Sequence, residues 1–296
     1  MELQNRKILV TGSHGFLGGT FIESLKKEKI PFVAYDRARP KALPADIDTV
    51  VHFAGLTPGS KGRLSPAQYK KANVECTDSL LKILSGSAHL TRFINIGSCA
   101  EYGFSAKPLK EGAKERPVSD YGVSKLEQSR LVARFARARG VKTINLRIFN
   151  VAGVPPRSAA GATSGKPFIF ETLVKRFKGP RVSIRVTNQE NVRDYVDTGD
   201  VMNAILSALT TKRGGAYEII NVCSGRKATI RDLAAIFGEI LNQPYVITNQ
   251  TKVVTSSIGD SMKARKLLGW KAGTPLKESI RRIVQSRLQE RLSAVG

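Results

Sequence analysis

The sequence predicts an α/β fold in which a doubly wound parallel sheet carries a smaller, substrate-binding lobe toward the carboxyl end. Short apolar runs alternate with helical patterns up to Asn150, which is typical of a parallel sheet. A glycine-rich turn separates the first apolar run from the first helical pattern. After Asn150 the alternation loosens into a loop rich in glycine, proline and serine, followed by mixed helices and short strands.

Each expected strand of the sheet is a short apolar run, the pattern of a strand buried on both faces. These runs lie at 7–10, 31–35, 49–55, 92–96 and 141–148. Apolar side chains spaced three or four residues apart predict the helices. The expected helices lie around 21–25 and at 69–84, 119–139, 168–177, 201–209, 230–241 and 276–292, with further short strands at 182–186, 217–222 and 246–248.

The composition is that of a folded protein. The chain has 296 residues, 41% of them hydrophobic, enough for one large domain or a domain plus a smaller lobe. Its first residues contain no apolar signal core and no run is long enough to span a bilayer, so we expect no membrane partner. The cysteines, Cys76, Cys99 and Cys223, form no Cys-x-x-Cys pair. This argues against disulfides and bound metal and favours a reducing, cytoplasmic compartment.

The net charge of +24 is the unusual feature of the composition. Such an excess is compatible with a polyanionic partner such as nucleic acid. The chain contains no arginine-glycine repeat, no aromatic RNA-binding strand motif and no long basic block. We therefore favour a basic background and a cleft for anionic nucleotides over a nucleic-acid partner.

The glycine-rich turn has the pattern Thr11-Gly12-x-x-Gly15-x-x-Gly18, between an apolar run and a helical pattern. Glycines at these positions permit a tight turn from strand to helix and close approach of the backbone to a pyrophosphate. The phosphates then lie at the amino terminus of the helix. The sequence predicts a dinucleotide site, with contacts from Gly12, Ser13, Gly15, Phe16, Leu17 and Gly18.

The carboxylate of Asp36 stands at the end of the second expected strand. At this position a carboxylate accepts hydrogen bonds from the adenosine ribose and repels a 2′-phosphate, which favours NAD. Arg37 follows at once, and an arginine here can bind that phosphate instead. The sequence therefore favours NAD as the cofactor and leaves NADP as the alternative.

Ser98, Tyr121 and Lys125 form the predicted catalytic group. Tyr121 and Lys125 are four residues apart, so they lie one turn apart on one face of a helix. A lysine ammonium and a positive nicotinamide ring would lower the pKa of the phenol from its usual value of about 10. The phenolate could then take a proton from a substrate hydroxyl while a hydride leaves the same carbon. Ser98, at a strand end, would stabilise charge on the reacting oxygen.

These motifs together resemble those of the extended short-chain dehydrogenase/reductase family, specifically its nucleotide-sugar epimerases, dehydratases and 4-ketoreductases. The resemblance covers almost the whole chain. It includes Phe53-Ala54-Gly55, similar to a family segment near the cofactor, and Asn73, similar to the asparagine of the following helix. The resemblance implies that these residues, with Tyr121 and Lys125, contribute to the cofactor site.

The same resemblance implies a domain division. A Rossmann-type NAD(P)-binding domain would comprise residues 1–150 with returning segments at about 194–223. The nucleotide-sugar lobe would comprise residues 151–193 and 224–296. The resemblance also implies a homodimer.

On the substrate side, the resemblance implies a nucleoside-diphosphate sugar as partner. Asn150 matches a family asparagine that contacts the sugar diphosphate, and Arg193 matches an arginine that binds the nucleotide phosphates. Ser98 and Tyr121 would contact the sugar itself.

One departure from the family pattern narrows the expected reaction. Dehydratases of the family carry acidic residues just after the catalytic serine or threonine, where this chain has Cys99 and Ala100. A 4,6-dehydratase is therefore disfavoured. The leading hypothesis is a C4 epimerase that uses NAD, and the alternative is an NAD(P)H-dependent reductase of 4-keto-6-deoxy sugars. A non-catalytic dinucleotide-sensing or nucleic-acid-binding protein is the hypothesis from a different class.

Overall fold

The structure is a computed structural model that describes residues 3–35, 43–58, 64–156, 169–177 and 182–292. Its central element is a sheet of six parallel strands in the order β2-β1-β3-β4-β5-β9. The strands are β1 (Ile8–Thr11), β2 (Phe32–Tyr35), β3 (Thr49–His52), β4 (Arg92–Ser98), β5 (Lys142–Ile148) and β9 (Tyr217–Val222). The parallel, doubly wound sheet predicted from the sequence is thereby confirmed.

The chain reverses direction across the sheet between β2 and β3. It builds β1 and β2 in one direction and then returns to place β3 on the other side of β1. Open sheets of this kind bind ligands in the crevice that such a reversal leaves at the carboxyl ends of the strands. The fold therefore indicates where to look for a site before any side chain is considered.

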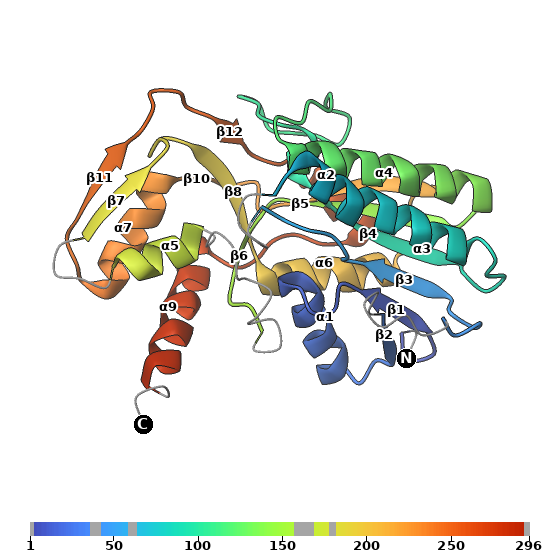
Figure 1. The fold of residues 1–296 in the computed structure, drawn as a ribbon. Coiled ribbons are helices and arrows are strands. Elements are labelled where there is room, and N and C mark those ends of the chain that lie inside the picture. Colours follow the sequence, from blue (N-terminus) through green and yellow to red (C-terminus); the bar gives the residue numbers. More distant parts are fainter. Residues whose placement is uncertain (1–2, 36–42, 59–63, 157–168, 178–181, 293–296) are drawn as a thin grey trace.

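Helices cover both faces of the sheet. In Figure 1, α3 (Cys76–Leu84) and α4 (Asp120–Arg139) lie above it, and α1 (Phe16–Lys27) and α6 (Thr198–Thr210) lie below it. Successive residues of β1 belong alternately to the two cores, as the two-residue period of a strand requires. None of the described helices is both long and apolar enough to cross a membrane.

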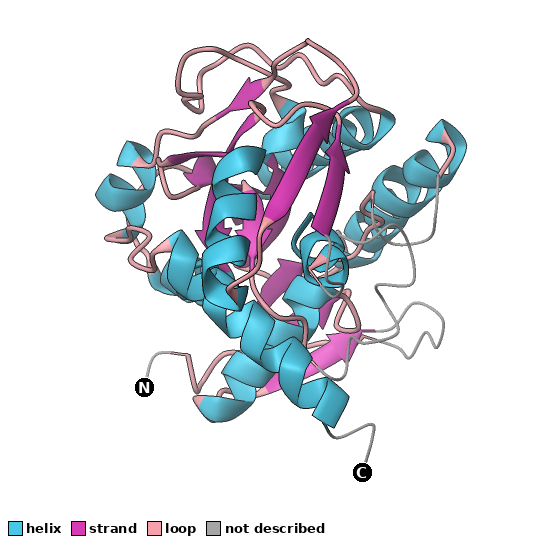
Figure 2. Cartoon of the chain, turned by 90° about the vertical axis from the view of Figure 1, so that its left-hand side faces the viewer, coloured by secondary structure: helices cyan, strands magenta, loops and turns pink. Residues whose placement is uncertain are grey.

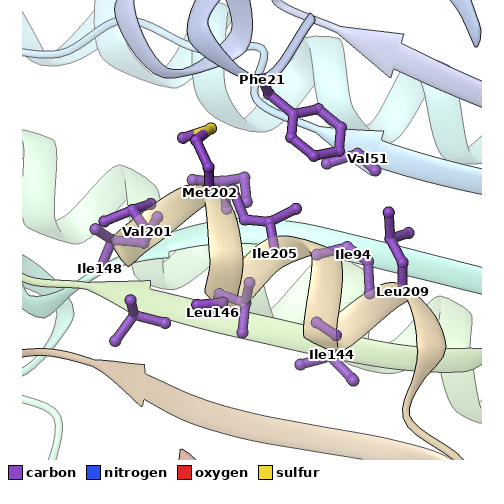
Figure 3. Close-up of a cluster of buried hydrophobic side chains, with 14 of the residues drawn as sticks. Phe21, Val51, Ile94, Ile144, Leu146, Ile148, Val201, Met202, Ile205 and Leu209 are labelled. Carbon is purple, nitrogen blue, oxygen red and sulfur yellow. The ribbon is translucent and has the colours of Figure 1, made fainter. Parts of the chain in front are cut away.

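The core below the sheet is aliphatic. Figure 3 shows Ile205 of α6 close to Ile94 of the central strands, with Leu146 on the strand side of the helix and Met202 extending toward α1, which carries Phe21. All five side chains are nearly or completely buried. At about 25 cal/mol for each Å² of apolar surface buried, this layer is a main source of stability for the sheet.

The second half of the chain forms a smaller lobe with its own apolar core. Its strands β7 (Val182–Val186) and β11 (Tyr245–Asn249) pair in parallel. The helices around this core are α5 (Ile169–Arg176), α7 (Ile230–Leu241) and α9 (Leu276–Leu292). Figure 2 is turned so that this side of the molecule faces the viewer, with helices in cyan and strands in magenta.

A small sheet joins the two parts of the molecule. Its central strand β8 (Val192–Asp197) pairs with β6 (Asn150–Ala152), β10 (Lys227–Thr229) and β12 (Ser256–Ser257). These short strands were not expected from the sequence, because runs of two to six residues with polar members carry little periodicity.

Some expectations need correction. The strand expected at 31–35 is an edge strand with Val33 38% exposed, so it is not buried on both faces. The helix expected at 69–84 begins at Pro66 and contains a π-helical turn, Lys70–Glu75. The segment around α8 (Met262–Leu268) was expected in the smaller lobe, but it packs against α6 and β9 and places Trp270 in the core of the large sheet.

The core of the smaller lobe supplies a direct test of its packing. Phe237 is fully buried and stacks on Phe177 with ring centroids 5.8 Å apart. We expect Phe237→Ala to lower the free energy of unfolding by about 3–5 kcal/mol, because it removes apolar contacts and leaves a cavity. Denaturant unfolding measures the loss. Val246→Ala, at a position 63% exposed in the same lobe, is the control; equal losses for both variants would contradict this packing.

Candidate active site

The candidate site lies where the chain reverses, at the carboxyl ends of β1 and β3. A cavity of about 200 Å³ opens there. It is lined by Thr11, Gly12, His14, Gly15, Tyr35, His52, Ala54, Gly55 and Leu80. A larger groove of about 410 Å³ lies between α7 and α9 and contains none of the predicted cofactor residues. The smaller cavity is lined by Gly12, Gly15, Ala54 and Gly55 of the predicted cofactor site, so it is the candidate cofactor cavity.

The glycine-rich turn is built so closely that side chains would not fit. Gly12 has φ +69°, and a Cβ there would lie 2.7 Å from the Ala54 nitrogen. A Cβ on Gly18 would lie 2.2 Å from the Gly12 oxygen. No side chain caps the amino terminus of α1, which begins at Phe16. The turn therefore leaves backbone N–H groups open toward the cavity, as a pyrophosphate requires.

A second loop at the cavity is fixed by Asn73. Its amide oxygen accepts from the Leu56 nitrogen at 2.6 Å, and its nitrogen donates to the Leu56 oxygen at 3.1 Å and to Ser124 Oγ at 2.9 Å. Asn73 is fully buried, so the structure gives it the role of holding the loop after Gly55 to α4. The cofactor contact expected of Asn73 from the sequence stays a prediction. Ala54 and Gly55 line the cavity, whereas Phe53 packs against Phe21 in the core below the sheet.

The structure brings Ser98 and Tyr121 into hydrogen-bonding contact. Ser98 ends β4, and Tyr121 lies in the first turn of α4. Burial raises the pKa of the Tyr121 phenol above its ordinary value, and the side-chain hydrogen bond with Ser98 acts in the opposite direction. The Ser98 hydroxyl also accepts from the Ala100 nitrogen at 3.2 Å, which fixes its position. The pair can therefore share one substrate oxygen.

Lys125 is buried one turn after Tyr121. Its ammonium donates to the Ile96 carbonyl oxygen at 2.6 Å and to the Gln128 amide oxygen. Burial lowers its pKa to about 8, although the Glu101 carboxylate acts to raise it. Lys125 is not among the main influences on the pKa of Tyr121. The expectation that Lys125, together with the positive nicotinamide ring of a bound cofactor, lowers the pKa of Tyr121 stays a prediction.

A buried ion pair holds the backbone of Ser98 in place. Glu101 accepts from the Ser98 nitrogen at 2.8 Å, and its other oxygen accepts from Ser129 Oγ at 2.9 Å and from Arg147 Nε at 2.8 Å. Glu101 and Arg147 are both fully buried. Removing either partner would leave an uncompensated buried charge, which typically costs about 3–5 kcal/mol. No periodic pattern in the sequence predicts this ion pair, because it forms only where β5 lies beside β4.

A second group of buried polar side chains lies at the wall of the cavity. His52 Nδ1 is 2.8 Å from Thr11 Oγ1, and its Nε2 is 2.9 Å from Thr77 Oγ1. Gln128 Nε2 donates to the same Thr77 oxygen at 2.8 Å. Burial, and then the charge of Lys125, lower the pKa of His52 to about 3, so it is neutral at pH 7. His52, Thr77 and Gln128 were not singled out from the sequence, because only the pairing of β3 with β1 and the packing of α4 bring them together.

The expected substrate residues lie toward the smaller lobe. Asn150 donates to the Asp194 carbonyl oxygen at 3.1 Å. Arg193 donates to the carbonyl oxygens of Val192, at 2.8 Å, and Thr255, at 3.0 Å. Its guanidinium lies 4.9 Å from the centre of the exposed Phe104 ring.

The position after Ser98 holds no acid or base. Burial raises the pKa of the Cys99 thiol to about 12, so the thiol is neutral at pH 7. Asp36 and Arg37, expected to read the adenosine ribose, lie outside the described residues.

Comparison with known proteins finds similar enzymes along most of the chain. The sequence model of the NAD dependent epimerase/dehydratase family matches residues 8–223. The chain is 26% identical to a UDP-glucose 4-epimerase of Azospirillum brasilense, over 95% of this chain and 91% of that protein. It is 30% identical to a UDP-glucose 4-epimerase of Streptococcus mutans, over 81% and 75% respectively. It is 26% identical to a GDP-6-deoxy-D-mannose reductase of Pseudomonas aeruginosa, over 96% and 99%.

Solved structures resemble the whole chain. MoeE5 in complex with UDP-glucuronic acid and NAD has a TM-score of 0.80 at 26% identity, over 96% of this chain and 99% of that one. A UDP-glucuronic acid 4-epimerase from Bacillus cereus, at 21% identity, has a TM-score of 0.83 and shares the fold.

The tight glycine turn predicts how a small added group would act. We expect Gly18→Ala to weaken NAD binding by about tenfold or more, because its Cβ would displace the Gly12 backbone at the cavity. Calorimetric titration with NAD measures the change. Gly86→Ala, whose Cβ would meet nothing closer than 3.8 Å, is the matched control. Unchanged NAD affinity in Gly18→Ala would remove this turn from the cofactor site.

The buried neutral His52 predicts acid sensitivity. Its folded pKa of about 3 lies below the ordinary value of 6.5, so from pH 6.5 down to 3 the unfolded chain binds a proton that the folded chain does not. Stability is therefore lost as pH falls through this window, by about 1.4 kcal/mol for each pH unit. In His52→Gln the free energy of unfolding should fall less steeply as pH is lowered, by about 1.4 kcal/mol for each pH unit. The exposed His14→Gln is the control; equal slopes in His52→Gln and wild type would contradict the assignment.

Proposed function

Because the chain belongs to the NAD dependent epimerase/dehydratase family, we propose that it is an NAD-dependent nucleoside-diphosphate-sugar epimerase that inverts C4 through a 4-keto sugar. The observation that carries the proposal is the side-chain contact between Ser98 and Tyr121, at the carboxyl end of a strand in the same sheet as the glycine-rich turn. The similar UDP-glucose 4-epimerases support the reaction and the substrate class. The glycine-rich turn fits the pyrophosphate of such a cofactor, because Gly12 and Gly18 have no room for side chains and the backbone can approach the phosphates.

In the proposed mechanism Tyr121 and Ser98 hold the C4 oxygen of the sugar. Tyr121 takes the proton of the C4 hydroxyl as the C4–H bond breaks, and Ser98 donates a hydrogen bond to the oxygen that becomes the ketone. NAD, when bound, supplies the acceptor that keeps the hydride and gives it back. After the keto sugar turns over, Tyr121 returns the proton to the same oxygen. The proton and hydride removed are both restored, so the reaction has no net redox change.

The glycine-rich turn and the substrate lobe would divide the binding work. Gly12 to Gly18 would hold the cofactor pyrophosphate at the start of α1, while Asn150 and Arg193 would hold the sugar-nucleotide diphosphate from the opposite side. Asp36 would accept the adenosine ribose hydroxyls, with Arg37 beside it. We also propose a homodimer that acts in the cytoplasm, in line with the family resemblance and the three cysteines without Cys-x-x-Cys pairing.

The second candidate is a reductase of 4-keto-6-deoxy sugars. It is favoured by the similarity to a GDP-6-deoxy-D-mannose reductase along 96% of the chain. The same Ser98 and Tyr121 would then protonate a ketone once, with consumption of NADH or NADPH. An epimerase needs no added reduced cofactor, whereas a reductase consumes one equivalent for each product molecule. A dehydratase is disfavoured, because Cys99 is a neutral thiol and Ala100 has no ionisable group.

Removing the Tyr121 hydroxyl tests the proposal. We expect Tyr121→Phe to retain NAD and to lose about 10²–10⁴-fold in turnover, the usual contribution of a general acid or base. Interconversion of UDP-glucose and UDP-galactose, followed by chromatography without added NADH, measures turnover. Bound cofactor is measured by mass spectrometry of nucleotides released on denaturation.

Tyr245→Phe, in the smaller lobe, is the control for loss of one phenolic hydroxyl. Full turnover in Tyr121→Phe would overturn the mechanism. Turnover that requires stoichiometric NADH or NADPH would favour the reductase.

A further inference from the structure

We propose that Gln128 is a positioning residue that holds the Lys125 ammonium in place and so sets the upper pH limit of the reaction. The inference rests on the proposed function for its kinetic consequence, though not for its structural part. Gln128 lies three residues after Lys125 on α4, so the two side chains share one face of the helix. Both are buried, and Gln128 is fully so.

The Gln128 amide has one orientation only. The Thr77 hydroxyl donates to the Asn73 carbonyl oxygen at 2.7 Å, so its own oxygen acts as an acceptor. The Gln128 nitrogen donates to that oxygen at 2.8 Å. Turning the amide over would place its oxygen against the Thr77 oxygen and its NH₂ group against the Lys125 ammonium. Gln128 therefore presents its oxygen to Lys125.

An ammonium has three N–H donors, and the protein uses two of them on Lys125. One goes to the Ile96 carbonyl oxygen at 2.6 Å and one to Gln128. Within the described part of the chain no third hydrogen bond to Lys125 is found. The two bonds fix the ammonium, so the third N–H is left for whatever occupies the cleft beside Tyr121.

The charged groups around Lys125 do not alone determine whether it is protonated, so its neutral hydrogen-bond acceptors also matter. Glu101, in the short helical turn after β4, favours the charged form of Lys125, but its carboxylate is already paired with Arg147. His52, from β3, is neutral at pH 7 and acts as a hydrogen-bonded neighbour of Gln128 and Thr77. Tyr121 is the remaining titratable group on the same helix face. With burial opposing the charge, the Gln128 amide oxygen is one of two neutral acceptors that stabilise it, and the Ile96 carbonyl oxygen is the other.

Two substitutions at this position should act in opposite directions. Gln128→Leu removes the acceptor from a buried cation, and a hydrogen bond to a charged group corresponds to a pKa shift of about one to two units. The pH at which kcat/KM declines on the alkaline side should fall by that much relative to wild type. Gln128→Glu places a carboxylate against Lys125, so the same limit should rise. A purely structural role would change stability without moving the pH limit in opposite directions.

The test combines kinetics with a direct titration of Lys125. The enzyme labelled with ¹³C at lysine Cε is titrated by NMR, with Lys125→Met assigning the signal. We expect the Lys125 pKa to fall in Gln128→Leu and to rise in Gln128→Glu, with the alkaline limit of UDP-glucose epimerisation following both. Glu127→Gln, a charge removal at the neighbouring position, is the control and should move neither.

An unchanged Lys125 pKa in the folded Gln128 variants would overturn the inference. If Gln128→Leu does not fold, Gln128→Glu alone decides, since an unmoved or lowered pKa contradicts the proposal. If wild type shows no epimerisation, the proposed function fails, while the NMR titration still decides the role of Gln128.

Discussion

The catalytic half of this molecule depends on the burial of a single ammonium group, that of Lys125. A buried cation is costly unless hydrogen-bond acceptors replace the lost water. The acceptors here are the Ile96 carbonyl, from β4, and the Gln128 amide, from α4 itself. The bond to Ile96 forms only when α4 lies over β4 in one rotation and one register. That placement brings Tyr121, one turn earlier, to Ser98 at the end of the strand.

Two opposing effects set the charge of this group. Burial lowers the Lys125 pKa, and Glu101 opposes the shift, with the balance near 8. At pH 7 the protonated form of Lys125 therefore predominates, because this pH lies below its pKa. Glu101 is restrained from pairing more closely by Arg147 and by the Ser98 nitrogen. The same carboxylate thus supports the serine and moderates the lysine.

The sequence predicts what is local or periodic. Buried strands, the glycine turn before α1 and the four-residue spacing of Tyr121 and Lys125 depend on neighbouring residues, and the parallel sheet that they predict is confirmed. His52 and Gln128 could not be predicted as partners, because 76 residues separate them and only the packing of β3 beneath α4 joins them. The acceptors of the Lys125 ammonium, Ile96 and Gln128, could not be predicted either, since spacing along a helix does not show which groups an ammonium will bond to.

Isotope retention at C4 tests the central claim most directly, namely that one tyrosine and one cofactor exchange a proton and a hydride at one carbon without elimination. UDP-glucose carrying deuterium at C4 is incubated with the enzyme in ordinary water, and the recovered sugar nucleotides are examined by mass spectrometry and NMR. The account predicts an epimerised product that keeps its deuterium at C4, because the hydride is returned and never exchanges with solvent. Loss of that deuterium to solvent, or a product that has lost water, would contradict it.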